Sequence, residues 1–123
     1  MRKSAFISMS VFLTMASATV ALAQKGATPE QIQMVYNAGR NQLGLLKYCQ
    51  DKGFADAQAV DSQTKMLSLL PPPGDPSQGD EAEANGRKGN VSMMGVSQDI
   101  TTAAKAQGVT EEKLCQTLAH PIK

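Results

Sequence analysis

The stretch that decides the fold runs from Thr28 to Cys49 and reads TPEQIQMVYNAGRNQLGLLKYC. Its first residues form a strong helix start, because Thr28 can cap the first turn, Pro29 suits the first helical position and Gln31 can complete a capping box. Apolar or small residues then recur at steps of three and four, which predicts a long helix with one core-facing side. That side carries Ile32, Val35, Gly39, Leu43, Leu46 and Cys49.

Two glycines, Gly39 and Gly44, lie inside this predicted helix. A glycine costs a helix interior about 0.8–1 kcal/mol relative to alanine. Gly39 falls on the apolar side, which indicates close approach of a neighbouring helix at that point. We expect the helix to end at Gly53, directly after Lys52, whose charge suits a helix C-terminus.

Residues 1–23 have the three parts of a cleaved signal peptide. Arg2 and Lys3 form a basic start, the segment from Ala5 to Val20 has no charge, and Ala21-Leu22-Ala23 offers small residues for cleavage before Gln24. The uncharged segment is shorter than the roughly 20 strongly apolar residues of a membrane-spanning helix. We therefore predict a protein that is exported to the periplasm or secreted after cleavage near Ala23.

The only two cysteines, Cys49 and Cys115, follow the predicted signal peptide. In an exported protein an even pair of this kind predicts a structural disulfide. The bridge would close a loop of about 65 residues, for which the chain-entropy model gives about 4 kcal/mol of stabilisation. It would also bring the end of the chain back onto the first helix.

Residues 24–123 are enough for one domain, and the rest of this segment also favours helices. A second helix is expected from a cap at Asp56 to Leu70, with Val60, Gln63, Leu67 and Leu70 on one face and Met66 beside it. The run from Pro71 to Gly79 predicts a loop.

The segment from Asp80 to Gln107 fits either one long helix softened by glycines or two helices with a break near residues 86–90, and we favour two. A last short helix is expected from Thr110, with Leu114, Cys115 and Leu118 facing inward. No segment alternates like a strand more convincingly than it repeats like a helix. The sequence therefore predicts an all-α fold, a small four- or five-helix bundle with one disulfide.

Charge and motif content exclude several classes of function. The segment from Gln24 has ten basic and eleven acidic residues, so it has no basic surface for nucleic acid or for an anionic membrane. His120 is the only histidine, next to Pro121 near the chain end. No nucleotide, zinc or hydrolase motif is present. We expect no catalytic centre, no metal and no cofactor.

Three weaker signals have a structural and a functional interpretation. Met66, Met93 and Met94 suggest a copper site, but core packing explains methionines at helical spacing better. An acidic cluster at Asp80 is better explained by a solvated helix start than by calcium. The polar side of the first helix is either an ordinary wet face, which we prefer, or an interaction face made of Tyr36, Asn37, Arg40 and Asn41.

The run from Thr28 to Cys49, followed by MGVSQDI and by KAQGVTEEKLC, resembles a family of small exported bacterial proteins described as pore-forming and early-secreted-antigen-like. The resemblance covers nearly all of the chain after the predicted signal peptide, and it implies a helical protein that acts on membranes. In size, export, helices and one disulfide, the chain is also loosely similar to periplasmic acid-stress chaperones of the HdeA and HdeB type.

Two functional hypotheses follow from these observations. The first is a non-catalytic exported protein of interaction or structural type, with the membrane activity that the family resemblance implies. The second is a periplasmic holdase chaperone that loosens in acid and exposes apolar surface. The expected partner is a protein or a membrane surface, and the protein itself is expected to be a monomer or a weak homo-oligomer.

Overall fold

The computed structural model describes residues 26–93 and 96–120, and for Met93 it describes the backbone alone. The predicted signal peptide, residues 1–23, lies outside these ranges. Within them the chain forms five helices, one two-stranded antiparallel sheet and one disulfide. The predicted small helical bundle held by a disulfide is therefore confirmed.

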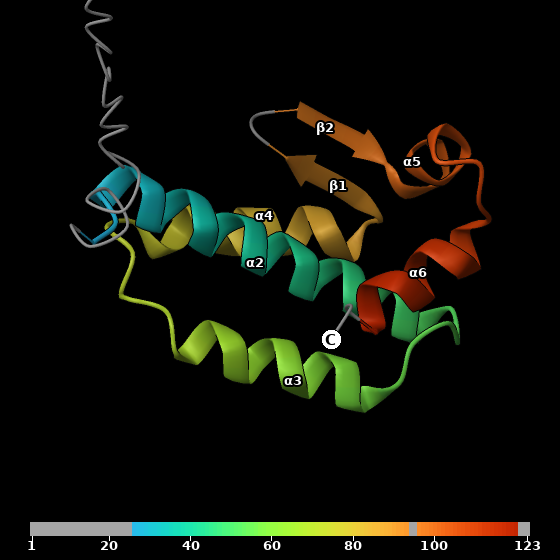
Figure 1. Cartoon of the computed structure of the whole chain (residues 1–123), viewed down its shortest axis with the longest axis horizontal. Coiled ribbons are helices and arrows are strands. Elements are labelled where there is room, and N and C mark those ends of the chain that lie inside the picture. The colour runs from blue at the N-terminus through green and yellow to red at the C-terminus, as the bar shows by residue number, and fades with distance from the viewer. Residues whose placement is uncertain (1–25, 94–95, 121–123) are drawn as a thin grey trace, which may run out of the picture.

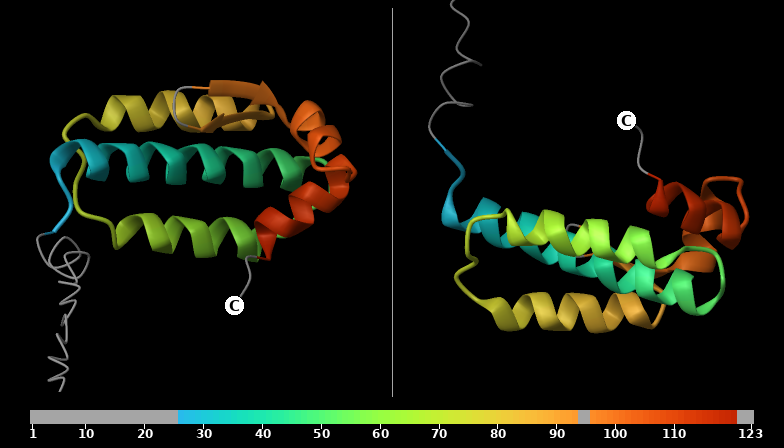
Figure 2. Two further views of the ribbon diagram at one scale, coloured as in Figure 1. Left: turned by 45° about the horizontal axis from the view of Figure 1, so that its top comes forward. Right: turned by 90° about the horizontal axis from the view of Figure 1, so that it is seen from below.

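The long helix α2 is the centre of the fold, and every other helix except α5 makes its main contacts along it or at its end (Figure 1). In Figure 2, α4, α2 and α3 form a row with α2 in the middle, and α6 crosses the C-terminal end of α2. In chain order the elements are α2 (Pro29–Asp51), α3 (Ala57–Ser68), α4 (Pro76–Arg87), β1 (Asn90–Met93), β2 (Val96–Asp99), α5 (Ile100–Ala106) and α6 (Glu111–Ala119).

Three of the helix starts expected from the sequence, those of α2, α3 and α6, are confirmed in atomic detail. At the start of α2, the Thr28 hydroxyl accepts from the Gln31 amide at 3.2 Å while the Gln31 side chain accepts from the Thr28 amide at 3.0 Å. Asp56 caps α3 and Thr110 caps α6 with a single bond, in which the side chain accepts from the backbone N–H three residues later. Because each cap satisfies a backbone N–H that lacks a helical partner, these short local patterns fix where the helices begin.

The core lies where the C-terminal half of α2 meets α5 and α6. Its buried members are Leu45, Cys49, Ile100, Ala103, Ala104, Leu114 and Cys115. Both cysteines are fully buried, and the disulfide between them joins α2 to α6 with their Cα atoms 5.6 Å apart. The predicted disulfide is thus confirmed, and it staples the last helix to the first.

The predicted loop from Pro71 to Gly79 is too long, because α4 already begins at Pro76. Asp75 is the N-cap of this helix and accepts from the Ser77 amide at 3.0 Å, while Pro76 occupies the first helical turn. The sequence Gly74-Asp75-Pro76 is typical of a turn and so fits the predicted loop. An aspartate followed by proline is equally a helix start, and here the helix prevails because α4 packs along α2.

The expected break near residues 86–90 is confirmed. The prediction that a helix follows directly after the break is wrong, because strands come first and the helix begins only at Ile100. Residues 90–93 and 96–99 are the two antiparallel strands of a β-hairpin, with Asn90 paired with Asp99 and Met93 with Val96. The hairpin follows Gly89, whose φ of +84° favours glycine, and α5 begins only at Ile100. A tertiary contact explains the strand, because the Asn41 side chain of α2 bonds the backbone of β1.

No helix in the described ranges is both long enough and apolar enough to cross a lipid bilayer.

Candidate interaction surfaces

The polar side of α2 that we considered as an interaction face is covered by α4. Glycines allow an unusually close approach of the two helices. A Cβ atom added at Gly44 would lie 2.1 Å from the Glu83 carbonyl oxygen, and one at Gly86 would lie 2.3 Å from the Asn41 carbonyl oxygen. Both neighbours are backbone atoms that a side-chain rotation cannot move. The two glycines therefore set the distance between α2 and α4.

Asn41 is only 3% exposed and joins three elements through its side chain. Its amide nitrogen donates to the Ala82 carbonyl of α4 and to the Asn90 carbonyl of β1, both at 3.0 Å. Its amide oxygen accepts from the Ser92 backbone N–H at 3.0 Å. A buried amide with these three bonds has a structural role, since it joins the backbones of α4 and β1 to α2 and satisfies its own polar atoms.

Arg40 lies at the centre of a charge cluster between α2 and α4. Its guanidinium donates to the Tyr36 hydroxyl and to Asp80, each at 2.7 Å, and its Nε lies 3.5 Å from Glu83. Partial burial disfavours the charged form, but the hydrogen bonds to Asp80 and Tyr36 and the Glu83 carboxylate outweigh it, so the pKa of Arg40 is raised. Glu83 also lies within ion-pair distance of Lys47 and Arg87.

The four residues of this candidate face thus make contacts within the chain. Tyr36 packs over Gly79, where an added Cβ would lie 2.3 Å from the tyrosine ring. Asn37 donates to the Gln78 side chain at 3.1 Å. The polar pattern of α2 therefore reflects a polar helix–helix interface.

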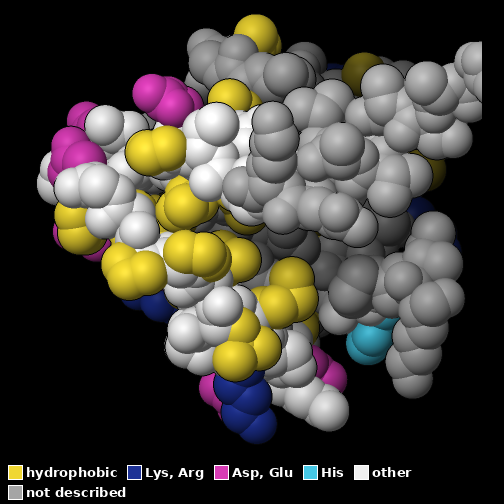
Figure 3. Space-filling model, turned by 60° about the vertical axis from the view of Figure 1, so that its left-hand side comes forward, with side chains coloured by type: hydrophobic (Ala, Val, Ile, Leu, Met, Phe, Trp, Pro, Cys, Tyr) yellow, Lys and Arg dark blue, Asp and Glu magenta, His cyan; other side chains and the backbone are white. Residues whose placement is uncertain are grey.

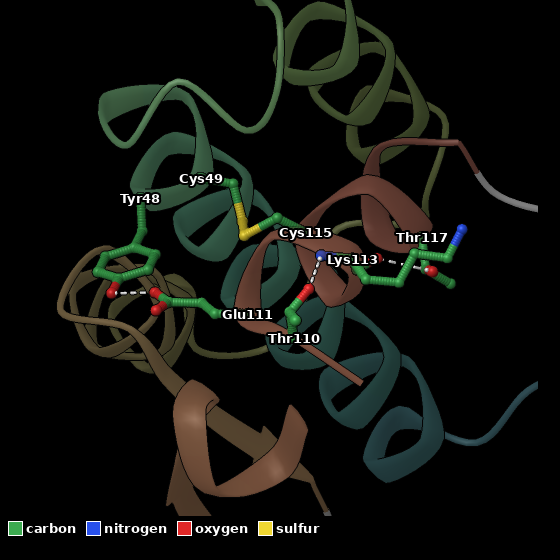
Figure 4. Close-up of a disulfide and its surroundings, with 7 residues drawn as sticks. All are labelled: Tyr48, Cys49, Thr110, Glu111, Lys113, Cys115 and Thr117. Atoms are coloured by element: carbon green, nitrogen blue, oxygen red, sulfur yellow. Dashed lines mark hydrogen bonds between the residues drawn. A yellow bond between two sulfur atoms is a disulfide. The ribbon is translucent and has the colours of Figure 1, made fainter. Parts of the chain in front are cut away.

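A second polar contact lies beside the disulfide and also joins α2 to α6. The Tyr48 hydroxyl donates to Glu111 at 2.5 Å (Figure 4), and the Lys52 ammonium lies 5.4 Å from the centre of the Tyr48 ring. The hydrogen bond to Glu111, with desolvation and the charges of Glu111 and Asp99, raises the pKa of Tyr48 to about 12. This bond holds the same two helices that the disulfide joins.

The described residues contain no group of three or more His, Cys, Asp or Glu side chains that could hold a metal ion. His120 is exposed at the end of α6 and lines a wide, shallow depression together with Phe54, Asp56 and Lys113. Asp80 of the acidic cluster pairs with Arg40. Met94 lies outside the described ranges, and Met66 is 62% exposed, so core packing is the wrong interpretation for Met66.

An apolar groove of about 270 Å³ lies between α2 and α3. Its lining is mainly apolar and contains no charged residue: Val35, Ala38, Gly39 and Gln42 from α2, Gln63, Met66 and Leu67 from α3, and Leu70 just after α3. Four large apolar side chains are more than half exposed at this end of the molecule: Met34, Val35, Met66 and Leu69. Figure 3 shows hydrophobic side chains gathered where α2 begins and α3 ends.

The groove stays open because α3 is held to the rest of the protein at few points. Its buried side chains are Ala59 and Gln63, and the Gln63 amide donates to the Gly39 carbonyl of α2 at 3.0 Å. Leu67 packs at Gly39, where an added Cβ would lie 2.7 Å from a leucine methyl, so the close approach expected at Gly39 is confirmed. α5 and α6 cover α2 only at its C-terminal half.

Sequence reasoning missed this groove because it assigned Val35, Leu67 and Leu70 to a closed core. One signal for it was present in the sequence. Met34-Val35 and Leu69-Leu70 are adjacent apolar pairs, and neighbours in a helix point about 100° apart, so one narrow buried stripe cannot cover both members. Such pairs indicate an apolar surface that is wider than the core needs.

Comparison of the chain with protein-family models, with curated proteins and with solved structures finds no match.

Proposed function

We propose that this protein is a non-catalytic exported protein of interaction type, and that the groove between α2 and α3 is its contact surface. The observation that carries the proposal is the exposed apolar end of the molecule, where Met66 is 62% exposed and Leu69 is 82% exposed. Contiguous apolar surface of this kind is costly in water and commonly marks a binding site. The uncharged lining of the groove favours an apolar partner over an ion, a nucleic acid or a sugar phosphate.

The export half of the proposal rests on the sequence of residues 1–23 and is supported by the disulfide, which is compatible with an oxidising compartment. Intact-mass measurement of the exported protein tests it. The expected mass is that of a chain beginning at Gln24 with one disulfide. A mass that retains residues 1–23 would contradict cleavage.

Site-specific photocrosslinking tests the contact surface. A photoreactive amino acid placed at Met66, on the groove, is compared with one at Asp61, an exposed position of the same helix. We expect position 66 to give discrete crosslinked products, and we expect position 61 to give none of the same products. Any captured protein is then purified, and it has to bind the unmodified chain at least tenfold more tightly than it binds Met66→Lys. Equal crosslinking from both positions would contradict the proposal.

Acid-stress holdase activity is the second candidate, and the weak attachment of α3 is the observation that favours it. A helix with two buried side chains can separate from α2 and enlarge the apolar surface without disturbing the disulfide-linked core. The test is suppression of aggregation of reduced α-lactalbumin from pH 7 to pH 3, with Met66→Lys as the matched variant. Equal aggregation with and without the protein across this range would eliminate the holdase.

A further inference from the structure

The sulfur atoms of the described residues divide into a buried pair and an exposed pair. Cys49 and Cys115 are fully buried and bonded to each other, so neither sulfur is open to a reagent in solution. The two methionine side chains that the structure describes, Met34 and Met66, are 55% and 62% exposed. A thioether that is open to solvent is readily oxidised to a sulfoxide. The oxidisable sulfur of the described residues therefore lies at these two methionines.

The two methionines differ in what surrounds them. Met66 lines the apolar groove between α2 and α3. Met34 lies outside the groove lining, beside an open depression that it shares with Gln33, Asn37 and Gln78. Oxidation at Met34 therefore adds a polar group beside polar neighbours, whereas oxidation at Met66 adds one to the uncharged lining of the groove.

The oxidant in this reaction is a peroxide. A lone pair of the methionine Sδ attacks one oxygen of hydrogen peroxide, the O–O bond breaks and an S–O bond forms. The departing hydroxide takes the proton of the transferred oxygen and leaves as water. Sulfur thereby loses two electrons to the peroxide, and a flexible apolar side chain becomes a polar, chiral sulfoxide.

A sulfoxide at Met66 changes what the groove can hold. The new oxygen is hydrated, and an apolar group that enters the groove has to remove this water without offering a hydrogen bond in return. The side chain points largely into solvent, and α3 is held to α2 through Ala59 and Gln63, so the added oxygen fits without unfolding of the bundle. Oxidation therefore acts on the groove and leaves the core unchanged.

We propose that Met66 is an oxidation site, at which reaction with a peroxide lowers the affinity of the groove for apolar partners. The inference rests on the proposed function, because it names the regulation of that same contact surface. Met34 has the same chemistry and nearly the same exposure but lies outside the groove, so it provides the control within the same molecule.

Peroxide treatment of the disulfide-bonded chain from Gln24, followed by peptide mass mapping, tests the first step. We expect sulfoxide to form at Met66 and Met34 with rates within about threefold of each other, as their similar exposure implies, while the disulfide stays intact. A rate at Met66 that is about tenfold or more below the rate at Met34 would overturn the proposal, because the sulfur would then be shielded.

The uncharged dye N-phenylnaphthylamine, which fluoresces in apolar surroundings, is the probe for the second step. Each protein is titrated with the dye before and after peroxide treatment and is compared with itself. Peroxide should weaken dye binding about tenfold in the unmodified chain and in Met34→Leu, the matched control, and less than about twofold in Met66→Leu. Both variants keep Met93 and Met94, so oxidation at those positions affects them alike. Met66→Gln should bind the dye about tenfold more weakly without any peroxide, because it places a polar side chain in the lining.

An equal loss of dye binding in Met66→Leu and Met34→Leu would overturn the proposal, and so would unchanged binding after Met66 has become a sulfoxide. Both results leave the proposed contact surface intact, because the untreated chain still binds the dye. An untreated chain that does not bind the dye contradicts the contact surface as well as its regulation. A loss of helical circular dichroism after treatment would also overturn the proposal, since the sulfoxide would then act by unfolding the protein.

Discussion

Replacing Gly44 with alanine should destabilise the protein, although helix propensity alone predicts the opposite. An alanine in a helix interior is about 0.8–1 kcal/mol more favourable than a glycine. In this fold the new Cβ would lie 2.1 Å from the Glu83 carbonyl oxygen and 2.9 Å from the Arg87 amide nitrogen, both in the backbone of α4. Because backbone atoms cannot rotate away, α4 has to move outward as a unit.

The size of the effect follows from three contributions. Overpacking costs about 1–3 kcal/mol. Outward movement of α4 also lengthens the bond from Asn41 to the Ala82 carbonyl, now 3.0 Å, and a lost hydrogen bond costs about 0.5–1.5 kcal/mol. Subtracting the gain in helix propensity leaves a destabilisation of about 2 kcal/mol. For a domain of this length that corresponds to a fall of about 8–16 °C in the melting temperature.

Gly39→Ala is the matched control on the same helix, because the nearest atom to its new Cβ is a methyl of the flexible Leu67 side chain, 2.7 Å away. We expect its stability to stay within about 1 kcal/mol of the unmodified protein, since the leucine can adjust and alanine favours the helix. Thermal and urea unfolding of both oxidised variants measure the difference. A Gly44→Ala variant as stable as the unmodified protein would refute the close packing of α2 against α4.

Four further predictions address the other contacts. Reduction of the Cys49–Cys115 disulfide, or its replacement by two alanines, should lower the free energy of unfolding by about 4 kcal/mol in urea titrations, and two free thiols in the untreated protein would contradict the bridge. Asn41→Leu should cost about 3 kcal/mol because it removes three buried hydrogen bonds that join α2, α4 and β1, and hydrogen exchange should show the loss first at the Ser92 amide. The hydrogen bond to Glu111 raises the pKa of Tyr48 to about 12, so the stabilisation that this bond provides is complete below pH 10 and is lost between about pH 10 and 12. The free energy of unfolding of Tyr48→Phe should therefore fall less over that range than that of the unmodified protein. Parallel curves for the two proteins would disprove the Glu111 bond. Oxidised protein should release no dye at pH 7 from vesicles of phosphatidylethanolamine and phosphatidylglycerol, with at most weak release after reduction or acidification, because no described helix is long and apolar enough to span a bilayer and the buried core faces can reach lipid only when the bundle opens; strong release at pH 7 would favour a pore-forming function instead.

The parts of the fold that could be predicted from the sequence have local causes. The start of α2 is fixed by Thr28 and Gln31, whose side chains and amides bond each other within one turn. The disulfide could be predicted because the chain has only two cysteines, each on the apolar side of a predicted helix. Neither inference needs knowledge of how distant segments pack.

The parts that could not be predicted depend on contacts between distant segments. The spacing of Val96, Ile100 and Ala103 fits a helix, but Asn41 bonds the backbone of β1 from about fifty residues away and favours a hairpin. Gly44 appears in the sequence only as an unfavourable helix residue, and its purpose becomes evident when α4 is placed against it.

The candidate site was missed for a related reason. A helical pattern identifies which face of α3 is apolar, but it does not tell how much of that face a neighbouring helix covers. Here Gln63 and Ala59 are buried against α2 while Met66 stays open. The polar pattern on α2 was misleading in the opposite way, because Arg40 and Asn41 are polar residues that serve an internal interface.

The most direct test of the contact surface is the solvent accessibility of the Met66 methyl group in the oxidised protein, measured by nuclear magnetic resonance at low protein concentration. A soluble paramagnetic agent should broaden the methyl signals of Met66 and Met34 at low concentration, because these side chains are 62% and 55% exposed. The buried methyls of Leu46 should stay sharp in the same sample. A Met66 signal as protected as those of Leu46 would mean that α3 closes over α2 and that the groove, and with it the proposed contact surface, does not exist in solution.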